Sequence, residues 1–192
     1  MVKILAGVDE VGRGSLVGPV LAAAVILNNK IDKKKLKDSK SLSKKKREIL
    51  NKYIKQNSKW SIASASLKEI EKLNILNASL LAMKRAILKL KIKPKIVMVD
   101  GNKVPKMKNY NLKYVIKGDR KIPEISAASI IAKVSRDKLM LKMSESFKKY
   151  KWDLNAGYGT RDHINAIRKY GVTRFHRKTF NPIHNILSHR KK

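Results

Sequence analysis

Residues 3–27 read KILAGVDEVGRGSLVGPVLAAAVIL and set the opening of the fold. Two apolar runs, at residues 3–9 and 20–27, predict two strands. The stretch between them, EVGRGSLVGP, is rich in glycine, as is typical of tight turns. The chain therefore opens as strand, turn and strand, and Asp9 and Glu10 lie where the first strand is predicted to end.

The region after this opening predicts a helix, a strand and a longer helix. Ser43 is a candidate N-cap for the first helix, and its apolar positions share a face: Ile49, Leu50, Tyr53 and Ile54. Residues 60–67 alternate apolar and polar side chains, which favours a strand with one solvated face. Residues 67–92 follow a helical spacing, with a core-facing stripe at Leu76, Leu80, Met83, Ile87 and Leu90.

Two further strands are expected to end on acidic residues. After Pro94, residues 95–100 (KIVMVD) predict a buried strand that ends on Asp100, and residues 111–119 predict another that ends on Asp119. Pro123 suits the first turn of a helix through residue 141. A later helix is predicted from a Thr160 cap to a stop at Gly171.

The composition indicates one domain with a polyanionic partner. The 192 residues include 46 Lys and Arg against 14 Asp and Glu, a net charge of +32, which favours binding to nucleic acid. Compositional bias toward lysine in an A/T-rich genome would also raise this charge. The chain has no cysteine, which excludes disulfides, thiolate metal sites and a catalytic thiol. The lack of cysteine also suits a reducing cytoplasm. Because the N-terminus begins with a predicted strand and no apolar stretch reaches membrane-spanning length, we expect a soluble, unprocessed protein, and a monomer by default.

Four acids stand out because the chain has few of them and these lie at predicted strand ends: Asp9, Glu10, Asp100 and Asp119. If the strands are neighbours, the carboxylates share one sheet edge and need cations between them. Hard oxygen ligands favour two Mg²⁺ or Mn²⁺ ions, an arrangement that hydrolyses phosphodiesters. Each acid alone would more often cap a turn. Asp137 is a less favoured ligand because it lies four to five turns into a predicted helix.

The glycine-rich turn can bring backbone groups close to a sugar. Gly12 and Gly14 have no side chains, so their N–H and C=O groups could contact a 2′-hydroxyl, the group that distinguishes RNA from DNA. Arg13 between them could hold a phosphate through its planar guanidinium. The alternatives are a simple tight connection and a solvated surface arginine.

The stretch from Gly7 to Gly14, followed by Leu16–Val17–Gly18–Pro19, resembles the signature of bacterial ribonuclease HII, a type 2 ribonuclease H. The similarity continues through Asp38–Ser39–Lys40, residues 73–76, 99–102, 117–119 and 125–137, and Gly157–Tyr158. It implies a ribonuclease H-like α/β fold, with a mixed central sheet flanked by helices and a C-terminal helical appendage. On this basis residues 1–192 form one catalytic domain, with residues 172–192 as a basic appendage.

The resemblance also implies an activity and a set of site residues. The enzyme would cut the RNA strand of RNA/DNA hybrids, and cut 5′ of ribonucleotides embedded in duplex DNA, leaving 3′-hydroxyl and 5′-phosphate ends. The four acids would be its metal-binding catalytic residues, and the Gly-Arg-Gly loop would distinguish it from ribonuclease HIII. The substrate-binding residues would be Gly12, Arg13, Gly14, Tyr158, Lys40, Asn102 and Lys133. Tyr158 would stack on the deoxyribose after the ribonucleotide.

This sequence departs from the family pattern at two positions. Ala156 stands where the family usually has lysine, and Arg120 stands where it often has serine, so phosphate contacts could be redistributed. Two alternative functions remain open: a non-catalytic basic nucleic-acid-binding protein, and another nuclease of the ribonuclease H superfamily such as a junction resolvase.

Overall fold

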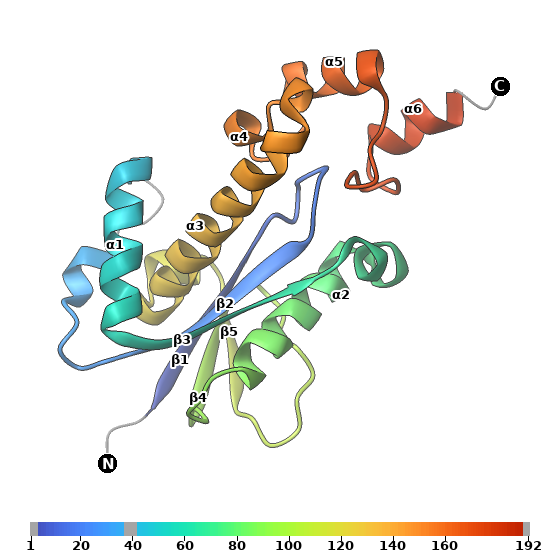
Figure 1. Cartoon of the computed structure of the whole chain (residues 1–192). Helices are drawn as coiled ribbons and strands as arrows, with labels where there is room; N and C mark the ends of the chain where they lie inside the picture. The colour runs from blue at the N-terminus through green and yellow to red at the C-terminus, as the bar shows by residue number, and fades with distance from the viewer. Residues whose placement is uncertain (1–3, 37–41, 190–192) are drawn as a thin grey trace.

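The computed structural model describes residues 4–36 and 42–189, and its centre is a mixed five-stranded sheet (Figure 1). The strand order is β3-β2-β1-β4-β5. The strands are β1 (Leu5–Val11), β2 (Val20–Leu27), β3 (Ser58–Ala65), β4 (Ile96–Asp100) and β5 (Leu112–Val115). β1, β2 and β3 pair antiparallel, whereas β4 lies parallel to β1 and β5 parallel to β4. The predicted α/β class with a mixed sheet is confirmed.

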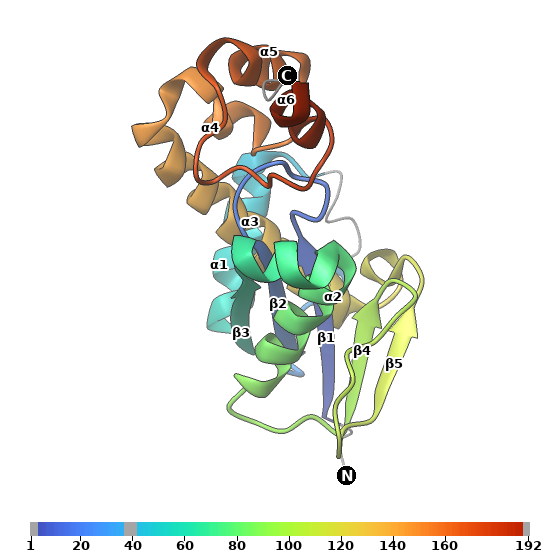
Figure 2. The same cartoon turned by 90° about the vertical axis from the view of Figure 1, so that its right-hand side faces the viewer.

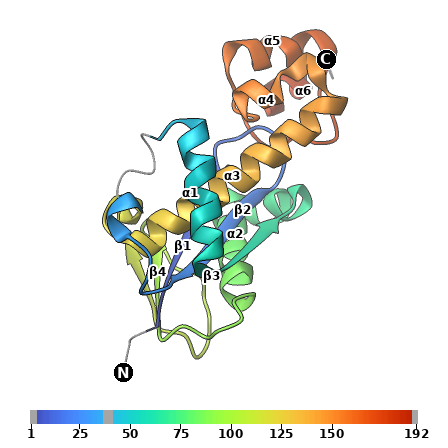
Figure 3. The same cartoon turned by 60° about the vertical axis from the view of Figure 1, so that its left-hand side comes forward.

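Helices cover both faces of the sheet (Figures 1 and 3). The helix α2 (Leu67–Leu88) packs on one face, whereas α1 (Lys44–Gln56) and α3 (Pro123–Ser146) pack on the other. Strand alternation explains this division, because Ala22 and Ala24 of β2 join the α2 core while Ala23 and Val25 join the opposite core. The apolar run at residues 20–27 is thus a strand buried on both faces.

Gly7 fixes the position of α3 over β1. A Cβ atom at this residue would fall 2.0 Å from the backbone carbon of Glu124, in the first turn of α3. Only glycine therefore permits so close an approach of helix to strand. As a result, the following turns of α3 lie over the carboxyl end of β1, where Asp9 and Glu10 lie.

Some predicted boundaries are wrong. β5 ends at Val115, so Asp119 does not end a strand, and it lies instead in the 3-10 helix η2 (Gly118–Arg120). The reason is local: Lys117 has a left-handed φ of 56°, which turns the chain out of the sheet. Helix α2 ends at Leu88 rather than residue 92, and Ile49 is 61% exposed rather than part of the buried face of α1.

The chain after α3 forms a helical region at one end of the molecule (Figure 2). It contains η3 (Lys148–Tyr150), α4 (Trp152–Asn155), α5 (Arg161–Tyr170) and α6 (Ile183–His189). Thr160 caps α5 and Gly171 follows its last residue, as predicted. A separate apolar cluster joins this region to the turn between β1 and β2, and includes Leu16, Val17, Met140, Trp152, Ile167 and Ile183. The proposed boundary at residue 172 stays a prediction.

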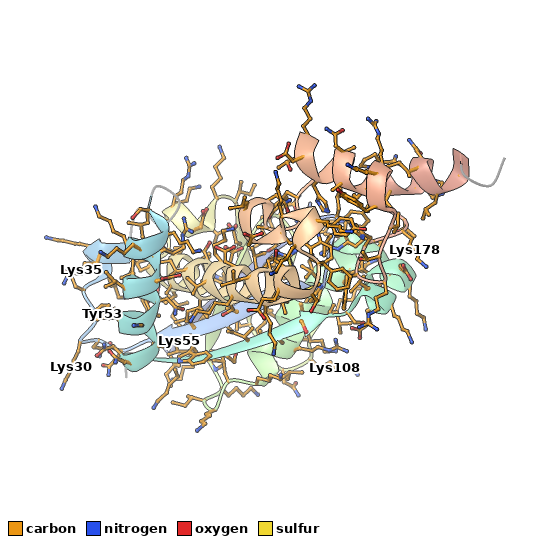
Figure 4. All side chains as sticks on the ribbon, turned by 45° about the horizontal axis from the view of Figure 1, so that its top comes forward. Lys30, Lys35, Tyr53, Lys55, Lys108 and Lys178 are labelled. Carbon is orange, nitrogen blue, oxygen red and sulfur yellow. The ribbon has the colours of Figure 1, made fainter. Side chains whose placement is uncertain are left out.

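Basic side chains lie on several parts of the described surface. Figure 4 shows Lys30, Lys35 and Lys55 around α1, with Lys108 and Lys178 on distant parts of the molecule. The remaining element before α1 is the 3-10 helix η1 (Lys33–Leu36), which is also rich in lysine. Across residues 4–36 and 42–189, none of the helices has the length and apolar character to span a bilayer.

Candidate active site

Three of the four predicted acids line one cavity of about 390 Å³ at the carboxyl end of β1. Asp9 and Glu10 come from β1, and Asp100 is the last residue of β4. These strands are parallel neighbours, so their carboxyl ends meet at the same edge of the sheet. The other walls come from α1 and α3: Arg47, Ser129, Ile130 and Lys133.

The acids in this cavity repel one another. Asp9 is only 6% exposed, and burial together with the nearby charges of Glu10 and Asp100 raises its pKa well above the ordinary value. A hydrogen bond with the Ser129 hydroxyl offsets part of this rise. Burial also raises the pKa of Glu10, while the neighbouring Arg13 guanidinium opposes that rise. A cation in this cavity would therefore stabilise the ionised carboxylates.

Asp119 lies beside this group without lining the cavity. The backbone N–H of Gly118 donates to Asp100 Oδ1 at 2.7 Å, which places η2 directly against the end of β4. Asp119 follows Gly118 and is 2% exposed. The fold thus brings the fourth acid to the same sheet edge, whereas its carboxylate stays buried in the structure.

The carboxylate oxygens of this cavity fit a hard divalent cation whose remaining ligands come from the substrate and from water. Within the described part of the chain, no three acidic or histidine side chains form a ready-made metal cage. Mg²⁺ is commonly held by one or two carboxylates together with phosphate oxygens and water, so a complete protein cage is not required. The mutual repulsion of Asp9, Glu10 and Asp100 is the feature that such an ion would relieve.

Two cationic side chains also line the cavity. Lys133 and Arg47 both line the cavity, and each faces Asp137: Lys133 Nζ lies 2.7 Å from Asp137 Oδ1, and Arg47 Nη1 lies 3.9 Å from Oδ2. Asp137 therefore holds these two cations and does not line the cavity itself. The sequence carries no signal for Arg47, which looks like one more cation in a basic helix, or for Ser129, a small residue inside a predicted helix.

The Gly-Arg-Gly loop lies between the acids and the helical region. Arg13 Nη1 is 3.3 Å from Glu10 Oε1, so the predicted phosphate ligand borders the carboxylate group. A Cβ atom at Gly14 would lie 3.9 Å from Cε1 of Tyr158. The predicted recognition loop and the predicted stacking tyrosine, 144 positions apart in the chain, are therefore neighbours, and Tyr158 is 37% exposed.

Two fully buried arginines donate hydrogen bonds to this loop. Arg136 donates to the carbonyls of Pro19 and Val17 and to Ser15 Oγ. Arg177 donates to the carbonyls of Gly18 (3.0 Å) and Arg13 (2.8 Å), and burial together with the charge of Arg136 lowers its pKa to about 9. These contacts fix the loop backbone. Sequence reasoning missed both residues, because an arginine gives no sign of burial in so basic a chain.

The loop is also joined directly to the segment that carries Tyr158. The Gly157 carbonyl accepts hydrogen bonds from the Leu16 backbone N–H at 2.8 Å and from Ser15 Oγ at 3.0 Å. Ala156, at the position where the family usually has lysine, ends α4 with a left-handed φ of 50°. The turn before Tyr158 is thus a constrained backbone element.

The remaining predicted contacts lie elsewhere. Lys40 lies outside the described residues. Asn102 is exposed and lines a different hollow, of about 650 Å³, between α2 and residues 102–106. Arg120 is exposed on η2, next to Asp119. The structure therefore does not bring Asn102 into the cavity of the acids.

Comparison with known proteins agrees with this geometry. The family model described as Ribonuclease HII matches residues 6–183. The chain is 71% identical over 185 residues to Ribonuclease HII of Pelagibacter ubique strain HTCC1062, covering 96% of this chain and 100% of that protein. It is 48% identical to Ribonuclease HII of Neisseria meningitidis serogroup B, covering 96% of each.

A solved structure shares the fold along nearly the whole chain. The ribonuclease H2 of Pyrococcus horikoshii OT3 superposes with a TM-score of 0.81 at 27% identity, covering 98% of this chain and 99% of that one. Sequence family, fold and the acidic cavity lead to one conclusion: the chain belongs to the ribonuclease HII family of metal-dependent endoribonucleases, the type 2 ribonucleases H.

Proposed function

We propose that this enzyme cuts the RNA strand of RNA/DNA hybrids, and cuts 5′ of single ribonucleotides within duplex DNA, leaving 3′-hydroxyl and 5′-phosphate ends. One observation carries the proposal. The cavity of Asp9, Glu10 and Asp100 lies beside the loop in which Gly14 approaches Tyr158, so a hydrolytic group and a sugar-recognition surface adjoin each other.

The four acids have the chemistry to hold two divalent ions, Mg²⁺ or Mn²⁺. Asp9, Glu10 and Asp100 offer oxygen ligands from the cavity, and Asp119 is placed by η2 next to Asp100. Such ions, when bound, supply an activated water and neutralise the charge on the leaving oxygen. The chain's own part is to orient the ligands: the Gly118 N–H fixes Asp100, and Ser129 contacts Asp9.

The loop recognises the ribose in this proposal. Backbone groups of Gly12 and Gly14 contact the 2′-hydroxyl, and Tyr158 stacks on the deoxyribose that follows. The hydrogen bonds from buried Arg136 and Arg177 to this loop favour this role, because a preorganised loop loses little conformational entropy when it binds a ribose. Phosphates of the cut strand contact Arg13 and Lys133, and Lys40 and Asn102 are further proposed contacts to the nucleic-acid backbone.

The charge of +32 supports a nucleic-acid duplex as partner. In this proposal the chain is a monomer with one catalytic domain, and residues 172–192 are a basic appendage.

The test is a labelled DNA duplex with one embedded ribonucleotide, incubated with Mg²⁺ and then with excess chelator. Cutting on the 5′ side of the ribonucleotide, with 3′-hydroxyl and 5′-phosphate ends and full inhibition by chelator, is expected. A matched all-DNA duplex and a four-way junction serve as controls. Cutting without metal, or cutting of the junction alone, would contradict the proposal.

A further inference from the structure

Two buried histidines lie behind the segment that carries Tyr158, outside the acidic cavity. His163, in the first turn of α5, is fully buried, and its Nδ1 lies 2.8 Å from the Tyr158 carbonyl oxygen. His176 is 1% exposed, and its Nε2 lies 3.3 Å from His163 Nε2. Neither ring lines the cavity of the acids, so neither is placed to act on the scissile phosphate.

The hydrogen-bond partners determine where the proton of His163 lies. Trp152 Nε1 is 2.9 Å from His163 Nε2, and because an indole N–H can only donate, Nε2 must accept. The proton of neutral His163 is therefore on Nδ1, from which it donates to the Tyr158 carbonyl. This carbonyl also accepts from the Thr160 backbone N–H at 2.9 Å.

The partners of His176 give it the complementary tautomer. Its Nδ1 lies 2.9 Å from the Thr173 backbone N–H, which can only donate. The proton of His176 is therefore on Nε2, directed at His163, and it reinforces Nε2 of His163 as an acceptor. Trp152 and His176 together leave His163 one hydrogen-bonding state, in which it holds the backbone at Tyr158.

We propose that His163 is a positioning residue for Tyr158, and that it sets the preference of the enzyme for a ribonucleotide-to-DNA step over a continuous hybrid. The inference rests on the proposed stacking role of Tyr158. The Tyr158 ring is partly exposed and lies against Gly14, so its direction depends on the backbone that His163 holds. A shift in this backbone changes which sugar the ring can meet, while the acids stay in place.

Two substitutions separate this role from general stability. In His163→Asn, the amide nitrogen stands near the original Nδ1 and can still donate to the Tyr158 carbonyl. In His163→Gln, the amide reaches toward the original Nε2 instead, so the donor to this carbonyl is lost. Both remove the buried ring and its packing with Trp152. The exposed His184, in α6, gives the control His184→Asn.

The readout is the ratio of kcat/KM on a duplex with one ribonucleotide to kcat/KM on a continuous RNA/DNA hybrid. We expect His163→Gln to lower this ratio about tenfold, the effect of one lost hydrogen bond. His163→Asn and His184→Asn should keep the wild-type ratio. Thermal unfolding reports the loss of packing separately. Equal ratios in the Gln and Asn variants would overturn the inference.

Tyr158→Ala distinguishes failure of this inference from failure of the proposed function. If Tyr158→Ala lowers the ratio, His163→Gln should add no further loss in that background, because both act through one side chain. Independent, multiplying losses would refute the positioning role of His163. If Tyr158→Ala leaves the ratio unchanged, the proposed stacking role itself is wrong.

Trp152→Phe provides a second route if His163→Gln does not fold. The phenyl ring keeps an apolar side chain in the cluster but has no N–H, so only the His176 N–H, at 3.3 Å, is left to hold the proton of His163 on Nδ1. We expect a smaller loss of the ratio than in His163→Gln. An unchanged ratio in a folded Trp152→Phe protein would count against tautomer control by Trp152.

Discussion

The guanidinium group of Arg136 lies directly against Gly12: a Cβ atom added to this glycine would fall 2.6 Å from Arg136 Cζ. Gly12 also has a left-handed φ of 91°, so it is restricted to glycine by space and by backbone conformation. Arg136 in turn holds Ser15 and Val17, so a shift here moves the whole loop. The glycine is thus required by the buried arginine as well as by any bound sugar.

Gly12→Ala should therefore damage both stability and cleavage. We expect the free energy of unfolding to fall by about 3 kcal/mol, from backbone strain and displacement of Arg136 together. Urea unfolding measures this loss. The matched control is Gly101→Ala, where φ is 102° but no atom lies within 4 Å of the added Cβ. That control should lose only about 1–2 kcal/mol, and an equal loss in both variants would show that Arg136 is not a constraint.

Mg²⁺ should stabilise the folded protein in the absence of substrate. Ions that bind the native carboxylates and not the unfolded chain raise the melting temperature, by an amount equivalent to about 2.7 kcal/mol when the ion is at 100 times its Kd. Asp9→Asn should reduce this increment. Asp162→Asn, which removes an exposed acid paired with Lys151, should leave it intact. A melting temperature independent of Mg²⁺ would contradict the idea that the acids form a cation site.

The buried histidine pair predicts a loss of stability in mild acid. Burial, with the neighbouring His163, lowers the pKa of His176 from 6.5 to about 4, and burial also lowers the pKa of His163. Since the unfolded chain binds protons first, the free energy of unfolding should fall as the pH drops from about 6.5 toward 4, by up to about 3 kcal/mol for His176. Above pH 6.5 this contribution is fully present.

The variant His176→Asn isolates this effect, because the amide oxygen can still accept from the Thr173 N–H. The raised pKa values of Asp9 and Glu10 act with the opposite sign in acid, but they are common to both proteins. Urea unfolding between pH 7 and 4.5 should give a flatter pH dependence for the variant than for the wild type. Identical slopes would mean that His176 does not titrate differently on unfolding.

The sequence was sufficient to predict those elements whose signals lie in neighbouring residues. The apolar run at residues 20–27, the Ser43 and Thr160 caps and the stop at Gly171 each depend on near neighbours in the chain, and each is present in the structure. The acids Asp9, Glu10 and Asp100 were found because carboxylates are scarce and follow apolar strands. Their roles in catalysis stay a prediction.

The sequence could not reveal contacts between residues that lie far apart in the chain and have no distinctive pattern around them. Arg136 reaches Pro19 across 117 positions and Arg177 reaches Arg13 across 164, and nothing local marks either as buried. The strand expected to end on Asp119 failed for another reason. Its apolar residues continue through Ile116, but Lys117 adopts a left-handed conformation that no apolar pattern encodes.

Asp100→Asn tests the central claim most directly, because the amide oxygen can still accept the Gly118 N–H while the negative charge is lost. Single-turnover cleavage and equilibrium binding are measured on the same duplex with one embedded ribonucleotide, in Mg²⁺. We predict cleavage at least about 100-fold slower, since metal-assisted hydrolysis depends on several kcal/mol of charge stabilisation, with binding as tight as wild type or tighter. Cleavage at the wild-type rate would contradict the account.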